Sequence, residues 1–253
     1  YNMPTRHRIG VIINYEVYGN GPALLFTHGF SATSKMCDDQ IDSFSKHYQL
    51  IIWDMRGHGH TDYPDDLSLY SEEETIEDIR AILNELQINK ANIGGMSLGG
   101  YMSLAFYYKY PKMVDSLIII DTGPGFKNPE ARENWNNYAL KQAKKFEKNG
   151  LDVLANKSKE MNPHNHKNSQ GLALAARGML TQKDDRIINE LTNIKVPSLI
   201  IVGENDKPFI AAANYMEKKI HNSKKVVIKD AGHAVNIDQP DIFNREVIKF
   251  LDA

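Results

Sequence analysis

Cysteine is nearly absent from this sequence, and long apolar runs and clusters of basic residues are absent altogether. Cys37 is the only cysteine in 253 residues. No disulfide can therefore form within the chain, and the cytoplasm is the simplest expected location. The longest apolar runs, such as residues 117–120 and 199–202, are too short to cross a membrane. The formal charge is −2 without a basic cluster, so we expect no nucleic-acid partner.

The composition is that of an ordinary globular chain, with 42% hydrophobic and 25% charged residues. Short apolar runs predict buried parallel strands, and helical patterns lie between most of them. This alternation predicts an α/β fold with a mostly parallel, doubly wound sheet that opens with an antiparallel hairpin around residues 8–18. The expected strands are residues 23–27, 49–53, 91–96, 116–120, 198–202 and 225–228, and the expected helices are residues 71–86, 97–108, 208–220 and 241–251.

One long segment interrupts the alternation of strands and helices. Residues 123–192 contain no strand-like run, are rich in asparagine and lysine, and have a helical pattern. That is far longer than a normal crossover between two parallel strands. We therefore expect residues 123–192 to form an inserted helical cap on a core made of residues 1–122 and 193–253.

A lone serine lies between glycines where an expected strand meets an expected helix. Gly95, Ser97 and Gly99 fit the pattern G-x-S-x-G, in which a sharp strand-to-helix turn raises the serine hydroxyl above the sheet. Small neighbours are needed because side chains there would collide with the strand and the helix. The pattern predicts that Ser97 is a nucleophile, and a helix N-cap serine in a glycine-rich turn is the alternative.

A nucleophilic serine needs a base within hydrogen-bond reach and an acid that orients the base. Asp206 and His233 follow successive expected strands, at the sheet edge where α/β folds build their sites. We therefore expect Ser97, His233 and Asp206 to form a catalytic triad. Asp121 is the main alternative acid, Glu204 is a weaker one, and Asp206 could instead cap a helix.

The remaining histidines divide into loop and surface residues. His28 is expected to shape a loop near the nucleophile, and His58 and His60 are expected to be structural. His164 and His166 lack partners at metal-ligand spacing, so we expect a solvated loop and no metal. Backbone N–H groups of Phe30 and Leu98 are expected to bind the oxyanion that forms when the serine attacks a carbonyl.

Five ordered motifs make the chain resemble the α/β-hydrolase superfamily over nearly its full length. They are the HGF motif at residues 28–30, "DMRGHGHTD" at 54–62, the G-x-S-x-G motif at 95–99, "VGENDKP" at 202–208 and "AGHAVNIDQPDIFNREVIKFL" at 231–251. The last is most similar to esterases and enol-lactone hydrolases. The resemblance implies an α/β-hydrolase fold with an eight-stranded sheet, a cap after the sixth strand and the same triad.

We therefore predict a serine hydrolase that cleaves small carboxylic esters through an acyl-enzyme and requires no cofactor. Enol-lactone, thioester and carbon–carbon bond hydrolases use the same triad and stay as alternatives, as does a small-molecule receptor on this scaffold. Arg177 could meet an anionic substrate or form an ordinary ion pair. A small-molecule ester is the expected partner, and a homo-oligomer is compatible with the sequence. The substrate pocket is expected to include Met96, Phe126, Trp135 and Met179.

Overall fold

A computed structural model describes residues 4–253 and contains one eight-stranded sheet in the order β1-β2-β4-β3-β5-β6-β7-β8. The β1–β2 and β2–β4 pairs are antiparallel, and the other neighbouring pairs are parallel. The strands are β1 (Thr5–Arg8), β2 (Val11–Tyr18), β3 (Ala23–Thr27), β4 (Gln49–Trp53), β5 (Ala91–Met96), β6 (Val114–Ile120), β7 (Ser198–Gly203) and β8 (Ser223–Ile228). This is the predicted fold.

Helices cover both faces of the sheet, and alternate residues of each central strand enter different cores. In β4, Ile51 and Trp53 face one core, and Leu50 and Ile52 face the other. The first core is covered by α2 (Glu72–Glu85), α3 (Leu98–Lys109) and α7 (Lys207–Lys219), and the second by α1 (Ile41–Phe44), α8 (Val235–Asp238) and α9 (Pro240–Leu251). Burial on both faces explains why the strands are continuous apolar runs in the sequence.

The opening hairpin turns earlier than the sequence pattern predicts. The turn lies at Ile9 and Gly10, whose φ angles are 50° and 73°. Two consecutive positive φ values match the twist of a tight hairpin, and glycine adopts the second without steric cost. As a result β2 alone spans residues 11–18, and its partner β1 precedes it.

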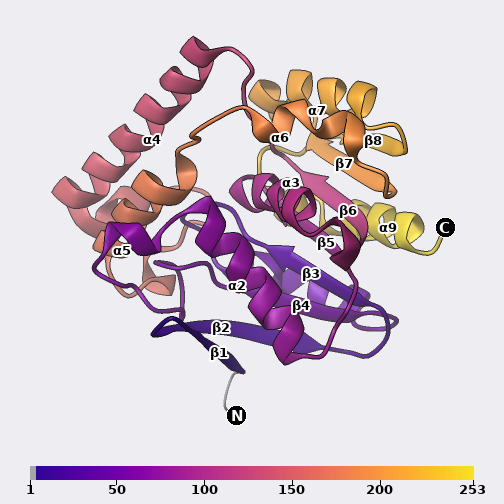
Figure 1. Cartoon of the computed structure of the whole chain (residues 1–253), viewed down its shortest axis with the longest axis horizontal. Coiled ribbons are helices and arrows are strands. Elements are labelled where there is room, and N and C mark those ends of the chain that lie inside the picture. The colour runs from indigo at the N-terminus through magenta and orange to yellow at the C-terminus, as the bar shows by residue number, and fades with distance from the viewer. Residues whose placement is uncertain (1–3) are drawn as a thin grey trace.

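Helices fill the long segment between β6 and β7, which follow each other in the sheet. It contains α4 (Pro129–Asn149), α5 (Ser169–Ala175) and α6 (Arg186–Asn189), together with short helical turns. Asn128 caps α4, because its side chain accepts hydrogen bonds from the N–H groups of Glu130 and Ala131. In Figure 1 α4 lies at the margin of the molecule, on the side away from the C-terminus.

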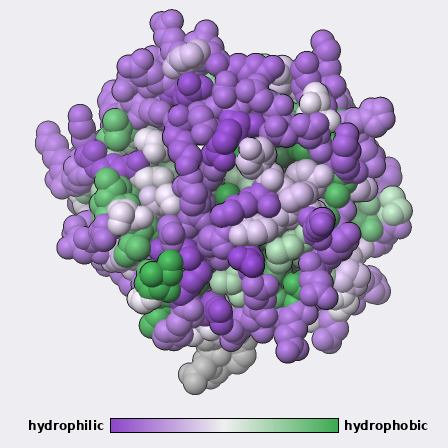
Figure 2. Space-filling model, in the orientation of Figure 1, coloured by the Kyte–Doolittle hydropathy of each residue, from purple (hydrophilic) through white to green (hydrophobic). Residues whose placement is uncertain are grey.

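The surface shown in Figure 2 is mostly hydrophilic, and its apolar residues form small, separate groups. Between residues 4 and 253, no helix combines the length and the apolar character that a membrane crossing requires. Cys37, the single cysteine, is buried and free.

Candidate active site

Ser97 occupies a strained turn between β5 and α3. Its φ and ψ angles are 53° and −118°, a combination that non-glycine residues rarely adopt outside functional sites. The flanking glycines are sterically required, since a Cβ on Gly95 would lie 2.3 Å from the Gly99 carbonyl oxygen. A Cβ on Gly99 would lie 2.0 Å from the Thr27 carbonyl oxygen. These contacts explain why only glycine fits around this serine.

A continuous series of hydrogen bonds links Ser97, His233 and Asp206. The Ser97 hydroxyl lies 3.0 Å from His233 Nε2, and His233 Nδ1 lies 2.8 Å from the Asp206 carboxylate. The carboxylate requires Nδ1 to carry a proton, which leaves Nε2 free to accept the serine proton. The structure thus brings together the three residues that the sequence predicts, in the order that nucleophilic catalysis needs.

Asp206 begins α7, but its side chain does not cap the helix. The carboxylate is 6% exposed and binds His233 instead. The His233 ring stacks on the Phe209 ring, with ring centres 5.2 Å apart. Glu204 accepts a hydrogen bond from the Asp230 N–H and so does not orient the histidine. The sequence did not lead us to expect the Phe209 contact with His233, although the position of Phe209 in the first helical turn after Asp206 places it near the triad.

Asp121, the alternative acid, lies beside Asp206 at the end of β6. Its carboxyl oxygens accept hydrogen bonds from the N–H groups of Gly203 and Val235, at 2.9 Å and 3.2 Å. Burial raises the pKa of Asp121 well above its usual value, and the neighbouring Asp206 carboxylate adds to the shift. A second anion next to Asp206 is therefore disfavoured, and Asp121 ties together β7 and the loop that carries His233.

The backbone around Gly29 passes directly over the nucleophile. A Cβ on Gly29 would lie 3.3 Å from Ser97 Cβ. Leu98 is the first residue of α3, so its N–H has no partner within the helix. The N–H groups of Phe30 and Leu98 therefore belong to the two backbone segments that flank the Ser97 hydroxyl.

Three buried histidines connect the Gly29–Phe30 loop to the inserted segment. His58 Nε2 accepts a hydrogen bond from the Ser31 N–H at 3.0 Å. His166 Nδ1 accepts one from the Gly59 N–H at 3.2 Å, and His166 Nε2 donates one to the Ser31 carbonyl at 2.8 Å. His28 accepts from the Met55 N–H at 2.9 Å. The expectation that His166 is solvated is wrong, because its ring is 8% exposed and packs near that of His58.

These contacts require neutral rings, since each histidine uses one nitrogen as an acceptor from a backbone N–H. Burial lowers the pKa of His28 to about 4. Burial also lowers the pKa of His58 well below the usual value, and the neighbouring His28 and His166 rings add to that shift. Burial likewise lowers the pKa of His166. In the unfolded chain all three rings gain protons near pH 6.5.

We therefore expect the free energy of unfolding to fall as the pH falls from 6.5 to 5, because the unfolded chain then binds more protons. Each histidine contributes at most about 1.4 kcal/mol per pH unit in this range, and Asp121, Asp78 and Asp38, whose raised pKa values act in the opposite direction, offset part of the sum. Urea unfolding followed by circular dichroism measures this slope. His166→Gln should reduce the slope by at most about 1.4 kcal/mol per pH unit, and the exposed control His221→Gln should leave it unchanged. A wild-type slope of zero would contradict the assignment of neutral rings.

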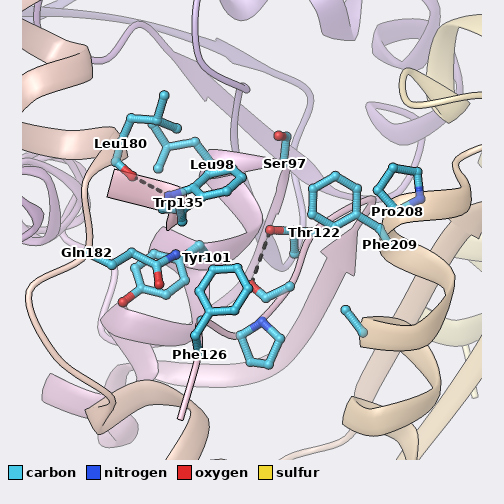
Figure 3. Close-up of a pocket in the computed structure, with 14 residues that line it drawn as sticks. Ser97, Leu98, Tyr101, Thr122, Phe126, Trp135, Leu180, Gln182, Pro208 and Phe209 are labelled. Carbon is cyan, nitrogen blue, oxygen red and sulfur yellow. Dashed lines mark hydrogen bonds between the residues drawn. The ribbon is translucent and has the colours of Figure 1, made fainter. Parts of the chain in front are cut away.

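Two cavities have Ser97 in their walls. The first, which we call the Gln182 cavity, measures about 120 Å³ and is drawn in Figure 3. The second, the Met161 cavity, measures about 400 Å³ and is lined by His233 as well as Ser97. Their common wall contains Trp135, Leu180, Pro208 and Phe209.

Three of the four residues predicted for the pocket lie in these walls. Phe126 lines the Gln182 cavity, Met96 lines the Met161 cavity and Trp135 lines both. Met179 does not, because it is 1% exposed and packs in the apolar core. It precedes Leu180, which does line both cavities. The one-residue offset follows from the direction of the helical turn, which an apolar sequence pattern does not reveal.

Positive charge is missing from both cavities. Among the described residues that line them there is no lysine or arginine, and Glu160 is the only carboxylate. Arg177 does not supply a cation, since it forms two hydrogen bonds with Glu147, at 2.8 Å and 3.1 Å. Within residues 4–253 no cluster of three or more potential metal-binding side chains occurs.

Comparison with known proteins agrees with this geometry. Residues 22–174 match the model of the alpha/beta hydrolase fold family. A 3-oxoadipate enol-lactonase of Acinetobacter baylyi is 28% identical over 96% of this chain and 94% of the relative. A 2-(acetamidomethylene)succinate hydrolase of Mesorhizobium japonicum is 26% identical over 96% of this chain and 92% of the relative.

A solved structure extends the similarity to three dimensions. The thermophilic esterase from Thermogutta terrifontis has a TM-score of 0.83 and 25% identity, and the match covers all of this chain and 98% of the esterase. The family model covers more than half of the chain, including β3 to β6 and the turn at Ser97. The chain therefore belongs to the α/β-hydrolase family.

Proposed function

We propose that this protein is a serine hydrolase that cleaves small, uncharged carboxylic esters through an acyl-enzyme intermediate. The observation that carries the proposal is the hydrogen-bonded series Asp206–His233–Ser97 at the junction of two cavities. A serine hydroxyl is a weak nucleophile unless such a base removes its proton.

In the proposed reaction His233 Nε2 takes the proton of Ser97 while the serine oxygen attacks the ester carbonyl. The N–H groups of Phe30 and Leu98 stabilise the oxyanion that forms. His233 then gives the proton to the departing alcohol. In the second half of the reaction His233 takes a proton from water, whose oxygen attacks the acyl-enzyme carbonyl. The bond to Ser97 breaks, Ser97 regains a proton from His233, and the acid is released. Asp206 holds the tautomer and stabilises the imidazolium cation. These steps use only groups of the chain and water.

The two cavities suit the two halves of an ester. His233 must lie beside the departing alcohol to protonate it, and it lines the Met161 cavity but not the Gln182 cavity. We therefore assign the alcohol to the Met161 cavity and the acyl group to the smaller Gln182 cavity. A volume of about 120 Å³ suits a short acyl group.

The charge of the walls favours a neutral substrate. The names of the two curated relatives above specify dicarboxylates or their derivatives. The two cavities at Ser97 offer a carboxylate-bearing substrate no lysine or arginine among their described residues, and Lys157 lines only the adjoining cavity beyond Met161. Burying an unpaired carboxylate is costly. A neutral lactone is the second candidate, since it is an internal ester and an enol-lactonase is among the relatives.

The inserted segment, residues 123–192, acts in this proposal as a cap. It supplies Phe126, Trp135, Leu180 and Gln182 to the walls next to Ser97. Differences in this segment would then set the substrate, while the core sets the chemistry.

We expect purified protein to hydrolyse p-nitrophenyl esters with highest kcat/KM for acetate to butanoate. The rate should fall steeply for octanoate and longer chains, because the Gln182 cavity cannot hold them. Initial rates of p-nitrophenolate release measure the series. Ethyl butanoate and monoethyl succinate, compared in a pH-stat, test the preference for an uncharged acyl group. Absence of turnover with every ester, or faster cleavage of the succinate, would contradict the proposal.

A further inference from the structure

The wall of the Gln182 cavity is mostly apolar, and Gln182 places an amide group in it. Phe126, Trp135, Leu180 and Phe209 form much of the wall (Figure 3). The side-chain oxygen Oε1 of Gln182 is buried and has no hydrogen-bond partner in the described part of the chain. Leaving a buried amide atom without a partner weakens folding, so the Gln182 oxygen calls for a partner that the described chain does not supply.

The position of Gln182 is fixed by two neighbouring residues of α4. Asn136 accepts a hydrogen bond from the Gln182 N–H and donates one to the Gln182 carbonyl, both at 2.7 Å. Trp135 Nε1 donates to the Leu180 carbonyl at 2.8 Å. The backbone is therefore held at Leu180 and again at Gln182, and the Gln182 side chain extends from it toward the cavity. This is the arrangement expected of a recognition residue, whose support must be rigid.

Tyr101 lies on the same wall but does not donate to Gln182 Oε1, which has no hydrogen-bond partner among the described residues. Burial raises the pKa of the Tyr101 hydroxyl, and the nearby Glu72 carboxylate adds to the shift. Glu72 in turn binds Arg186 at 2.8 Å. Figure 3 shows Gln182 on the side of the cavity opposite Phe209. The described part of the chain therefore supplies no hydrogen-bond donor to Gln182 Oε1.

We propose that Gln182 is a specificity-determining residue that hydrogen-bonds a hydroxyl group on the acyl half of the substrate. This rests on the proposed ester hydrolysis and narrows its substrate class to esters of short hydroxy acids. A hydroxyl suits the site because it donates and accepts. The terminal torsion of glutamine is soft, so the amide can turn either its oxygen or its nitrogen to that group.

The test compares ethyl butanoate with ethyl 2-hydroxybutanoate and ethyl 3-hydroxybutanoate in a pH-stat. For wild type we expect at least one hydroxylated ester to have a kcat/KM about tenfold higher than ethyl butanoate. Gln182→Met keeps the side-chain length and removes both polar atoms, so that ratio should fall to about one or below. Gln170→Met changes another glutamine of the inserted segment, which is exposed and lines neither cavity, and should keep the wild-type ratio.

A second measurement separates this proposal from the proposed reaction. In Ser97→Ala protein, the dissociation constants of the same esters follow from the fluorescence of Trp135, which lines the cavity. The hydroxylated ester should bind more tightly, and Gln182→Met in the same background should remove the difference. Turnover of ethyl butanoate without a hydroxyl preference would overturn the role of Gln182 alone. A preference that survives Gln182→Met would overturn it too. If wild type cleaves none of the three esters, the ratio of the dissociation constants of ethyl butanoate and the hydroxylated esters still decides the role of Gln182.

Discussion

Replacing Ser97 with alanine should lower kcat for ester hydrolysis by about 10⁶-fold, to the residual rate that binding and oxyanion stabilisation provide. The substitution removes one oxygen, the atom that lies 3.0 Å from His233 Nε2. Alanine and serine share a Cβ and similar backbone restrictions, so the turn at φ 53° is equally strained in both and the fold is kept. Steady-state kinetics with p-nitrophenyl butanoate, at enzyme concentrations high enough to detect the residual rate, measure the loss.

The matched control is Ser103→Ala, in the same helix. The Ser103 hydroxyl donates to the Gly99 carbonyl at 2.8 Å and does not face either cavity. Its removal should cost about 1 kcal/mol of stability and leave kcat nearly unchanged. If Ser97→Ala kept more than a hundredth of the activity, the serine would not be the nucleophile, and a receptor or a different hydrolytic mechanism would have to be considered.

Replacing Asp206 with asparagine should lower kcat by about 10⁴-fold, the size of the effect of this change in a well-studied serine protease triad. The amide keeps the shape of the carboxylate but can donate a hydrogen bond to His233 Nδ1. This favours the tautomer with the proton on Nε2, which cannot accept the Ser97 proton. KM should change little, because the lost interaction acts mainly in the transition state.

This substitution also distinguishes Asp206 from Asp121. The Asp121 carboxyl is fixed by the backbone N–H groups of Gly203 and Val235, and His233 Nδ1 bonds Asp206 instead, so we expect Asp121 not to take over this hydrogen bond. The control is Glu204→Gln, two residues earlier, whose carboxylate bonds the Asp230 N–H. It should leave kcat nearly unchanged. Asp206→Asn protein with kcat near that of wild type would show that another group orients the histidine.

Local pattern was sufficient for most of the fold. The runs at residues 23–27, 49–53 and 91–96 coincide with β3, β4 and β5, because a strand buried on both faces must be apolar throughout. The helix predicted from Ser71 begins as expected, since the Ser71 hydroxyl accepts from the Glu74 N–H. The hairpin turn was misplaced, because the pattern gave no weight to the short strand Thr5–Arg8.

Predictions failed where the environment of a side chain depends on distant segments. His166 was expected in solvent, yet its partners Ser31 and Gly59 lie more than 100 residues away in the chain. Met179 has an apolar side chain of the kind that lines pockets, but the helical turn directs it into the core. Gln182 gave no signal in the sequence at all. The role proposed for Gln182 depends on its hydrogen bonds with Asn136, on the Trp135–Leu180 hydrogen bond and on the cavity, which only folding brings together.

The sequence by itself determined most of the strands, the longer helices of the core and the order of Ser97, Asp206 and His233, because buried strands and tight glycine turns leave local patterns. The tertiary structure decided which acid meets the histidine, which histidines are neutral and buried, and which side chains line the cavities at Ser97. The physical reason is that burial, pKa and hydrogen-bond satisfaction depend on everything that surrounds a group. Here those surroundings come from parts of the chain separated by up to 136 residues.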